Sequence, residues 1–194
     1  MNKAYWKKYY RKQGAWWKKH LSGNKLTKPT AFAVFCNSII KPQSKIIELG
    51  SGNGRDAYFF GARGHEVTGV DYTTKPPRKE NVKFVKQDAG DFLKQHEKKY
   101  DIIYSRFFFH AISKQKLKEI LDLSSGIILA EARSIRDKSF KKDHKRNLID
   151  GDQLITDLLK KNFHIMFFQE GKGLAVYKQE DPIIIRIMAE KWKK

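Results

Sequence analysis

The chemically most informative part of the sequence is a glycine-rich turn followed at some distance by an acidic residue. Three glycines, Gly50, Gly52 and Gly54, alternate with other residues directly after a short apolar run. Glycines allow the backbone to turn tightly and to approach a ligand closely. Asp71 follows at about the 20-residue spacing at which an acid accepts hydrogen bonds from both hydroxyls of a ribose. The pattern therefore predicts a site for a ribose-containing cofactor.

The elements around the turn place it where ligands bind in open α/β sheets. An apolar strand is expected over residues 46–49, a helix after Gly54, and a second strand over residues 66–70 that ends at Asp71. The turn reads G-x-G-x-G, which differs from the G-x-G-x-x-G of dinucleotide sites, and no G-K-[ST] follows. A turn without phosphate-binding features indicates a cofactor without phosphates.

Residues 48–54, which read E-L-G-S-G-N-G, resemble the first motif of class I S-adenosylmethionine-dependent methyltransferases. The resemblance extends over about residues 44–177. It implies an α/β fold, with a single Rossmann-like doubly wound sheet of seven strands, the last of them antiparallel. It also implies S-adenosyl-L-methionine as cofactor and S-adenosyl-L-homocysteine as product.

The same resemblance implies which residues hold the cofactor. The turn approaches it by backbone, and residues 71–72 lie at the ribose and adenine. Residues 88–89 lie at the adenine amino group, and residues 105–106 flank the methionine part and the reactive methyl. For Asp71 and Asp88 the alternative is a helix cap or a surface charge. The implied set is Glu48, Gly50, Ser51, Gly52, Asn53, Gly54, Asp71, Tyr72, Asp88, Ala89, Ser105 and Arg106.

Candidate catalytic residues follow the fourth and fifth expected strands. A hydroxyl acceptor loses its proton on methylation, so a positioned base helps, and histidine titrates near neutrality. His110 follows the fourth strand, and His144 lies in a charged connection over residues 133–148. Glu131 and Arg133 leave the fifth strand and face the same side. This connection also has the acids and the histidine to hold Mg²⁺, but its spacing demands no metal.

The acceptor is narrowed by motifs that the sequence lacks. No [DNS]-P-P-[YFW] of exocyclic-amine methylation follows the fourth strand, and no Pro-Cys of C5-cytosine chemistry is present. The lysine-aspartate-lysine-glutamate set of RNA ribose methyltransferases is not evident. Segments such as Y-S-R-F-F-F-H-A-I and D-H-K-R-N-L-I-D resemble small methyltransferases of glycan assembly in bacteria and large DNA viruses. We therefore expect a sugar hydroxyl in a glycan or glycoconjugate.

The charge distribution keeps other functions open. The net charge is +19, and eleven lysines and arginines precede Glu48 without any acid. Such a surface attracts polyanions, so an RNA methyltransferase is the first alternative. A methyltransferase fold kept as a non-catalytic, cofactor-binding module is the second. Aromatic doublets alternate with basic ones before Gly23, which predicts amphipathic helices that pack on the core.

Length and composition predict one domain, with residues 1–45 as a helical lid and residues 46–194 as the methyltransferase core. No apolar run reaches the roughly 18–20 residues of a membrane span, and the N-terminus lacks a signal-peptide pattern. The one cysteine, Cys36, excludes an internal disulfide and a cysteine-cluster metal site, and we expect a cytoplasmic setting.

Secondary structure is also expected beyond the motif. The predicted strands are 82–85, 100–104, 126–131 and a hairpin of 163–168 with 173–177, and the predicted helices are 29–40, 114–121, 150–161 and a last one after Pro182. Residues 72–81 are predicted to form a loop.

Overall fold

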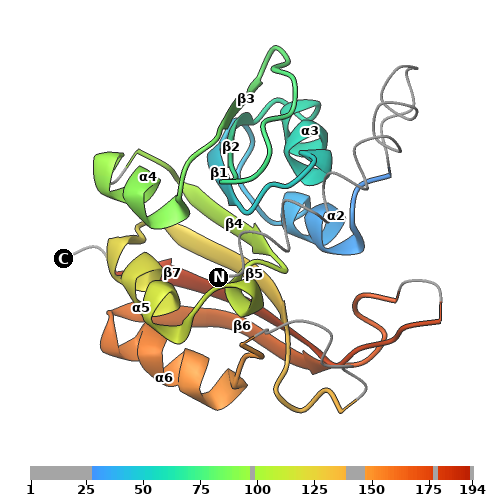
Figure 1. The fold of residues 1–194 in the computed structure, drawn as a ribbon, viewed down its shortest axis with the longest axis vertical. Coiled ribbons are helices and arrows are strands. Elements are labelled where there is room, and N and C mark those ends of the chain that lie inside the picture. Colours follow the sequence, from blue (N-terminus) through green and yellow to red (C-terminus); the bar gives the residue numbers. More distant parts are fainter. Residues whose placement is uncertain (1–27, 97–98, 139–146, 177–178, 193–194) are drawn as a thin grey trace.

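Seven strands form one mixed sheet in the order β3-β2-β1-β4-β5-β7-β6, with helices on both faces (Figure 1). The structure is a computed structural model, and it describes residues 28–96, 99–138, 147–176 and 179–192. The strands are β1 (Lys45–Leu49), β2 (Glu66–Val70), β3 (Val82–Val85), β4 (Ile102–Arg106), β5 (Ile127–Arg133), β6 (Phe163–Gly171) and β7 (Ile184–Lys191). The helices are α2 (Ala31–Asn37), α3 (Arg55–Gly61), α4 (Ala89–Gln95), the 3-10 turn η1 (Phe109–Ala111), α5 (Lys114–Leu123) and α6 (Gly151–Lys160).

The topology confirms the predicted fold class. Neighbouring strands from β3 to β5 pair in parallel, whereas β7 pairs antiparallel with both β5 and β6. The last strand in chain order is therefore the antiparallel one. Because the carboxyl ends of the parallel strands meet at one edge of the sheet, the predicted site residues are brought to a common edge.

Two apolar layers hold the sheet between its helices. On one face, α2 and α3 contribute Phe32 and Phe60, which pack against Tyr104 of β4. On the other face, α4, α5 and α6 contribute Phe92, Leu121 and Leu158 among others. The central strands are buried on both faces, which explains their nearly continuous apolar sequences.

The prediction of a helix after Pro182 is wrong, because residues 184–191 form strand β7. The apolar residues Ile184, Ile187 and Met188 have helical spacing, but Ile185 and Ala189, which lie off that pattern, are buried as well as Ile184 and Ile187. Both faces of β7 are covered, so the strand carries a continuous apolar run instead of an alternating one. Its β-branched isoleucines favour this extended conformation.

The predicted hairpin of residues 163–168 with residues 173–177 is also wrong, because the partner of β6 is β7, which was expected to be a helix. Strand β6 pairs with β7, whereas residues 172–176 belong to no strand. Helix α4 was not predicted. It is only seven residues long and contains Gly90, so its apolar period is too short to stand out.

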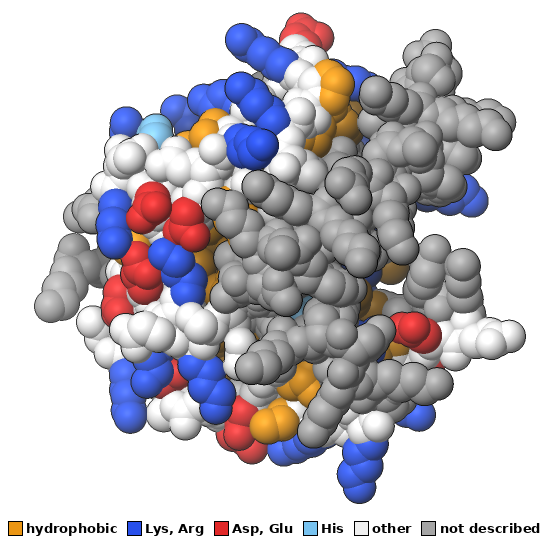
Figure 2. All heavy atoms as spheres, viewed as in Figure 1, with side chains coloured by type: hydrophobic (Ala, Val, Ile, Leu, Met, Phe, Trp, Pro, Cys, Tyr) orange, Lys and Arg blue, Asp and Glu red, His pale blue; other side chains and the backbone are white. Residues whose placement is uncertain are grey.

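The connection from β2 to β3 contains no helix, as the prediction of a loop over residues 72–81 implies. Parallel neighbours are usually joined by a helical crossover. Here the Tyr58 hydroxyl donates a hydrogen bond of 2.6 Å to the carbonyl of Pro77, which fixes the connection against α3. Figure 2 shows lysine and arginine side chains around it, and Lys75, Arg78 and Lys79 are exposed.

The described part of the predicted lid begins at residue 28. Helix α2 packs into the same core as α3, with Phe32, Ala33 and Cys36 buried. Residues 1–27, with the predicted amphipathic helices, lie outside the described residues. Within the described part of the chain, no helix is long and apolar enough to cross a membrane.

Candidate functional site

The glycine turn leaves β1 with a backbone that only glycine adopts easily. Gly50 has a φ of +73°, and its amide donates a hydrogen bond of 2.8 Å to the carbonyl of Val70 at the end of β2. A Cβ atom at Gly50 would lie 2.7 Å from the ring of Phe108. Any larger residue would therefore strain the turn and displace the segment after β4.

Asp71 connects this turn to the loop after β2. Its Oδ2 accepts a hydrogen bond of 3.1 Å from the Gly52 amide, and its Oδ1 accepts bonds of 2.7 and 2.6 Å from the amide and hydroxyl of Thr73. The side chain of Thr74 also bonds the Gly52 carbonyl. The carboxylate thus lies at the edge of the turn, where the sequence places the ribose.

Three buried polar atoms around the end of β1 have no hydrogen-bond partner among the described residues. They are Glu48 Oε2, Ser51 Oγ and Ser105 Oγ. Ser105 pairs in register with Leu49, so all three border the turn. Buried polar atoms are normally hydrogen-bonded, and an unmet group points to a ligand. The ammonium, carboxylate and hydroxyl groups of S-adenosylmethionine would supply such partners.

Glu48 is well suited to a cationic partner. Burial, followed by the nearby charge of Asp56, raises the pKa of the Glu48 carboxyl well above its ordinary value. A positive group beside it would favour the ionised form. The ammonium of the cofactor's methionine part meets this requirement, so Glu48 fits its predicted place in the cofactor site.

Asp88 has a structural role as well as the predicted one. Its Oδ1 caps α4 by accepting hydrogen bonds of 2.9 and 3.3 Å from the amides of Gly90 and Asp91, and it pairs with Lys116 Nζ at 2.8 Å. Within the described residues, Oδ2 has no such contact. One oxygen therefore holds the helix, and the other is available to a cofactor's amino group.

The remaining predicted cofactor residues lie at the same edge. Asn53 and Gly54 complete the turn, and Gly54 begins α3 with a φ of +76°. Tyr72 is half-buried beside Asp71, and burial raises the pKa of its hydroxyl. Ala89 is buried at the start of α4.

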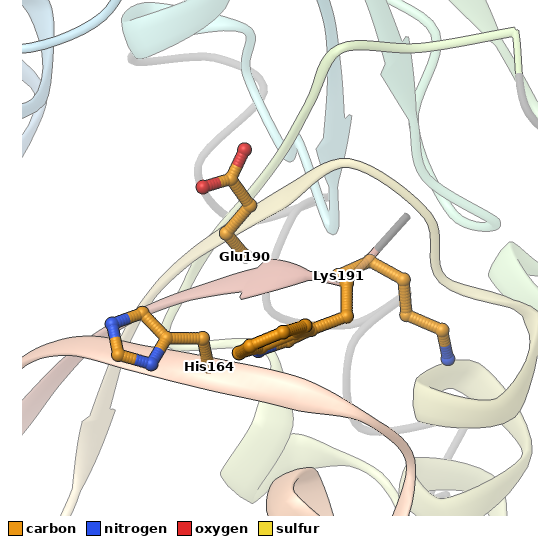
Figure 3. Close-up of a pocket in the computed structure, with 4 residues that line it drawn as sticks. His164, Glu190 and Lys191 are labelled. Atoms are coloured by element: carbon orange, nitrogen blue, oxygen red, sulfur yellow. The ribbon is translucent and has the colours of Figure 1, made fainter. Parts of the chain in front are cut away.

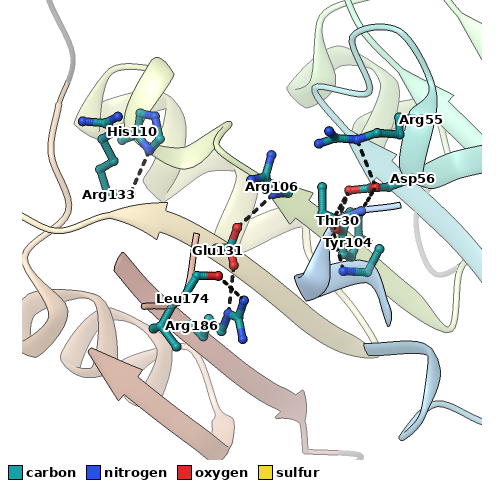
Figure 4. A network of polar contacts seen from close by, with 11 residues as sticks. Thr30, Arg55, Asp56, Tyr104, Arg106, His110, Glu131, Arg133, Leu174 and Arg186 are labelled. Carbon is teal, nitrogen blue, oxygen red and sulfur yellow. Dashed lines mark hydrogen bonds and ion pairs between the residues drawn. The ribbon is translucent and has the colours of Figure 1, made fainter. Parts of the chain in front are cut away.

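On the other side of the turn, Glu131 lies between two arginines from neighbouring strands (Figure 4). Arg106 Nε donates a hydrogen bond of 2.9 Å to Oε1, and Arg186 Nε donates one of 2.8 Å to Oε2. Glu131 is 1% exposed, and its burial raises the pKa of its carboxyl against the opposing effect of both arginines. Because both oxygens are bound, this geometry favours a positioning role over the predicted catalytic one.

The candidate base His110 is buried within the fold. Its Nδ1 accepts a hydrogen bond of 3.0 Å from the amide of Arg133, which places the ring proton on Nε2. Its carbonyl accepts one of 2.9 Å from the Asn147 amide. A neutral imidazole held in this way has no ring nitrogen open to take a proton, so the contacts favour a structural role. The other candidate, His144, lies outside the described residues.

The predicted catalytic residue Arg133 forms ion pairs with two carboxylates, those of Asp137 and Glu180. It lies 3.4 Å from Asp137 and 2.7 Å from Glu180 (Nη1 to Oδ2 and Nη2 to Oε2). Within the described part of the chain, no group of three histidines, cysteines or carboxylates could hold a metal ion.

Several residues of the site were not predicted. Asp56 accepts hydrogen bonds from the Thr30 amide and hydroxyl and from the Tyr104 hydroxyl, at 2.8–3.0 Å, and so ties α2 and β4 to the start of α3. Arg186 was also missed, although a lone arginine within an apolar run is a signal that a buried acid faces it.

A surface hollow at the edge strand is separate from these residues. It is lined by His164, Glu190, Lys191 and Trp192 (Figure 3). These residues lie at the start of β6 and the end of β7, at the edge opposite to the carboxyl ends of the parallel strands. The hollow is therefore not part of the candidate site.

Part of the chain matches a known protein family. Residues 46–126, from β1 to the residue before β5, match the family model described as a methyltransferase domain. A sequence search of curated proteins finds no match.

Solved structures share the fold at low sequence identity. A 1,6-didemethyltoxoflavin-N1-methyltransferase from Burkholderia thailandensis is 15% identical, with a TM-score of 0.66 and coverage of 93% of this chain and 87% of that chain. A TehB-like SAM-dependent methyltransferase from Corynebacterium glutamicum is 14% identical, with a TM-score of 0.63 and coverage of 98% and 100%. The [4+2]-cyclase SpnF is 12% identical, with a TM-score of 0.66 and coverage of 82% and 79%.

The cyclase shows that this fold also serves other chemistry, so the structural likeness establishes the fold alone. The family match covers residues 46–126 and agrees with the predicted activity class, a methyltransferase. The glycine turn and the family match are both consistent with S-adenosylmethionine as the cofactor.

Proposed function

We propose that the protein transfers the methyl group of S-adenosylmethionine to a hydroxyl group of a sugar in a glycan or glycoconjugate. The observation that carries this proposal is the pairing of a guanidinium with an aromatic ring beside the cofactor site. The Arg106 guanidinium carbon lies 4.2 Å from the centre of the Phe107 ring at the end of β4. Sugar rings pack on aromatic faces and form hydrogen bonds with planar polar groups. The resemblance of this segment to glycan methyltransferases supports the same reading.

The chain's own residues would contribute alignment, burial and proton removal. The bound cofactor supplies a methyl group already activated by its sulfonium. The turn and Asp71 hold the cofactor, and the segment after β4 holds the acceptor in line with the methyl group. The acceptor hydroxyl must lose its proton, and His144 is the proposed base. The flanking residues Asp137 and Asn147 lie beside the carboxyl end of β5, where the charged connection leaves and returns.

An RNA acceptor is the second candidate, and the charge distribution favours it. Eleven basic residues precede Glu48 without an acid, which is the electrostatic pattern of a phosphate-binding surface. Methylation of RNA with binding that weakens steeply as salt rises would support this reading.

The deciding experiment measures transfer of a radiolabelled methyl group to deprotected rhamnose-type glycans and to total RNA. We expect label on the glycans and much less with Asp71→Ala at limiting cofactor, which tests that the cofactor site is used. Label on RNA alone would overturn the sugar proposal. Cofactor binding without transfer to either class would favour the non-catalytic alternative.

A further inference from the structure

We propose that Arg106 binds an acidic group of the acceptor, so that the methylated sugar carries a carboxylate or a phosphate. This inference rests on the proposed function, because it names a chemical class among sugar acceptors. It also assigns Glu131 a positioning role toward Arg106.

Arg106 is held by two contacts. Its Nε donates a hydrogen bond of 2.9 Å to Glu131 Oε1. Its guanidinium carbon lies 4.2 Å from the centre of the Phe107 ring. Within the described residues, the terminal nitrogens make no hydrogen bond, and the side chain is 21% exposed. A planar fork fixed in this way is prepared for two parallel hydrogen bonds to a carboxylate or a phosphate.

The charges around Glu131 do not balance. One carboxylate lies between two guanidiniums, which leaves one positive charge in excess in this group. Arg186 already has other partners, because it also donates a hydrogen bond of 2.7 Å to the Leu174 carbonyl and faces the Phe32 ring. Arg106, the more exposed of the two arginines, is therefore the one that can bind an additional anion.

Stability alone does not explain why Arg106, Glu131 and Arg186 are buried together. Removing ions from water is costly, and well-packed apolar residues often stabilise a fold as well as a buried ion group does. Glu131 is too firmly bound to act as a base, since both of its oxygens accept from guanidiniums. Fixing the direction of Arg106 is a role that accounts for the carboxylate.

The backbone after β4 supports the same role. Phe107 has a φ of +57°, a conformation that is rare and strained for a bulky residue. Its amide donates a hydrogen bond of 2.7 Å to the Glu131 carbonyl. This left-handed turn places the ring against Arg106, and such strain is typical of functional sites.

The position of Arg106 indicates the acceptor rather than the adenine. Arg106 ends β4, and the preceding Ser105 pairs with Leu49, which leads directly into the glycine turn. Asp71 and Asp88, the predicted ribose and adenine contacts, end the other half of the sheet. The carboxylate of the cofactor's own methionine part is the competing partner for Arg106, and the experiment separates the two.

The test compares matched acidic and neutral sugars as acceptors: methyl β-glucuronide with methyl β-glucoside, and glucose 6-phosphate with glucose. We expect wild type to prefer the acidic member of at least one pair by tenfold or more in kcat/KM, and Arg106→Gln to abolish this preference. Glu131→Gln should reduce it. The control is Arg63→Gln, because Arg63 also lies over a phenylalanine ring but follows the C-terminal end of α3, away from the glycine turn. The pair that shows the preference identifies the acid as carboxylate or phosphate.

A second measurement does not depend on turnover. Inorganic phosphate should raise the thermal midpoint of the complex with S-adenosylhomocysteine in wild type and Arg63→Gln, and less in Arg106→Gln. An equal shift in all three proteins would overturn the inference, as would equal use of neutral and acidic sugars. Loss of S-adenosylhomocysteine affinity in Arg106→Gln, with the acid preference kept, would assign Arg106 to the cofactor instead. Transfer to no sugar at all, with the Arg106-dependent phosphate shift intact, would contradict the proposed function but not the anion site.

Discussion

Lys116 Nζ lies 2.8 Å from Asp88 Oδ1, the same oxygen that caps helix α4. The lysine comes from α5 and is itself held by Glu119 at 2.9 Å. Three donors, the amides of Gly90 and Asp91 and the ammonium of Lys116, thus converge on Oδ1 of Asp88, and within the described residues none of them contacts Oδ2. Lys116 is therefore expected to position Asp88 for the amino group of adenine.

Replacing Lys116 with methionine should weaken this positioning. Because both side chains are about a quarter exposed, we expect roughly a two- to fivefold loss of S-adenosylhomocysteine affinity, in line with the small energies of exposed ion pairs. The preference over S-inosylhomocysteine, which lacks the amino group, should fall as well. Calorimetry with both ligands measures this, with the exposed Lys118→Met as control. A preference that survives in Lys116→Met would contradict the positioning role.

The Asp71→Ala variant should lose cofactor affinity. A carboxylate that accepts from ribose hydroxyls contributes at least about 1–3 kcal/mol, because its removal leaves those hydroxyls unpaired. The substitution also removes the bonds to the Gly52 and Thr73 amides, so the turn itself should loosen. Calorimetric titration with S-adenosylhomocysteine tests this, and the exposed Asp91→Ala serves as comparison. Unchanged affinity in Asp71→Ala would contradict the prediction that Asp71 binds the ribose hydroxyls.

Glu48 should make the cofactor-free protein less stable as pH rises. Below its ordinary pKa of 4.5, the carboxyl is protonated in both the folded and the unfolded chain. Above that pH the unfolded chain ionises first, while burial keeps the native carboxyl protonated, so the free energy of unfolding falls until the raised native pKa is passed. Glu48→Gln carries no charge and should escape this loss.

Thermal midpoints between pH 4.5 and 8 measure the effect of Glu48. The advantage of Glu48→Gln over wild type should increase with pH and then level off, and S-adenosylmethionine should stabilise the variant less than wild type. Glu66→Gln, at an exposed position in β2, is the control. A difference between Glu48→Gln and wild type that stays constant with pH would contradict the account.

The two histidines should respond differently to substitution. His144→Ala should lower turnover roughly 10²-fold or more without changing cofactor affinity, because removal of a positioned base affects the chemical step. His110→Ala should instead lower the thermal midpoint, since it empties a buried site and leaves the Arg133 amide without its acceptor, Nδ1. Rates and midpoints measured on both variants separate the roles. Near-wild-type turnover in His144→Ala would return His110 to consideration as the base.

The positions of the glycine turn and of Asp71 in the fold could be predicted because the information is local. Within a single strand-turn-helix-strand unit, the glycine spacing and the distance to Asp71 are set by the chain itself. Asp88 could be placed for a related reason, since it follows a strand that the sequence shows clearly. These residues depend little on how distant parts of the chain pack.

The acceptor half depends on strand order, which the pattern of residues did not reveal. Arg186 reaches Glu131 only because β7 lies between β5 and β6, whereas the spacing of its apolar residues resembled a helix. Because residues 184–191 were predicted as a helix, β6 was paired with residues 173–177 instead of with β7. Lys116 was missed because its contact with Asp88 joins two helices that are separate in sequence.

The position of β7 also affects how the protein is made. Strand β6 leaves the ribosome before the strand that must lie between it and β5. Until β7 is synthesised, one edge of β5 and both edges of β6 are unpaired, and such edges pair readily with other chains. Arg186 arrives with β7, so the buried Glu131 also lacks one of its two ion pairs during this interval. We therefore expect the nascent chain to be most prone to aggregation before β7 has been translated.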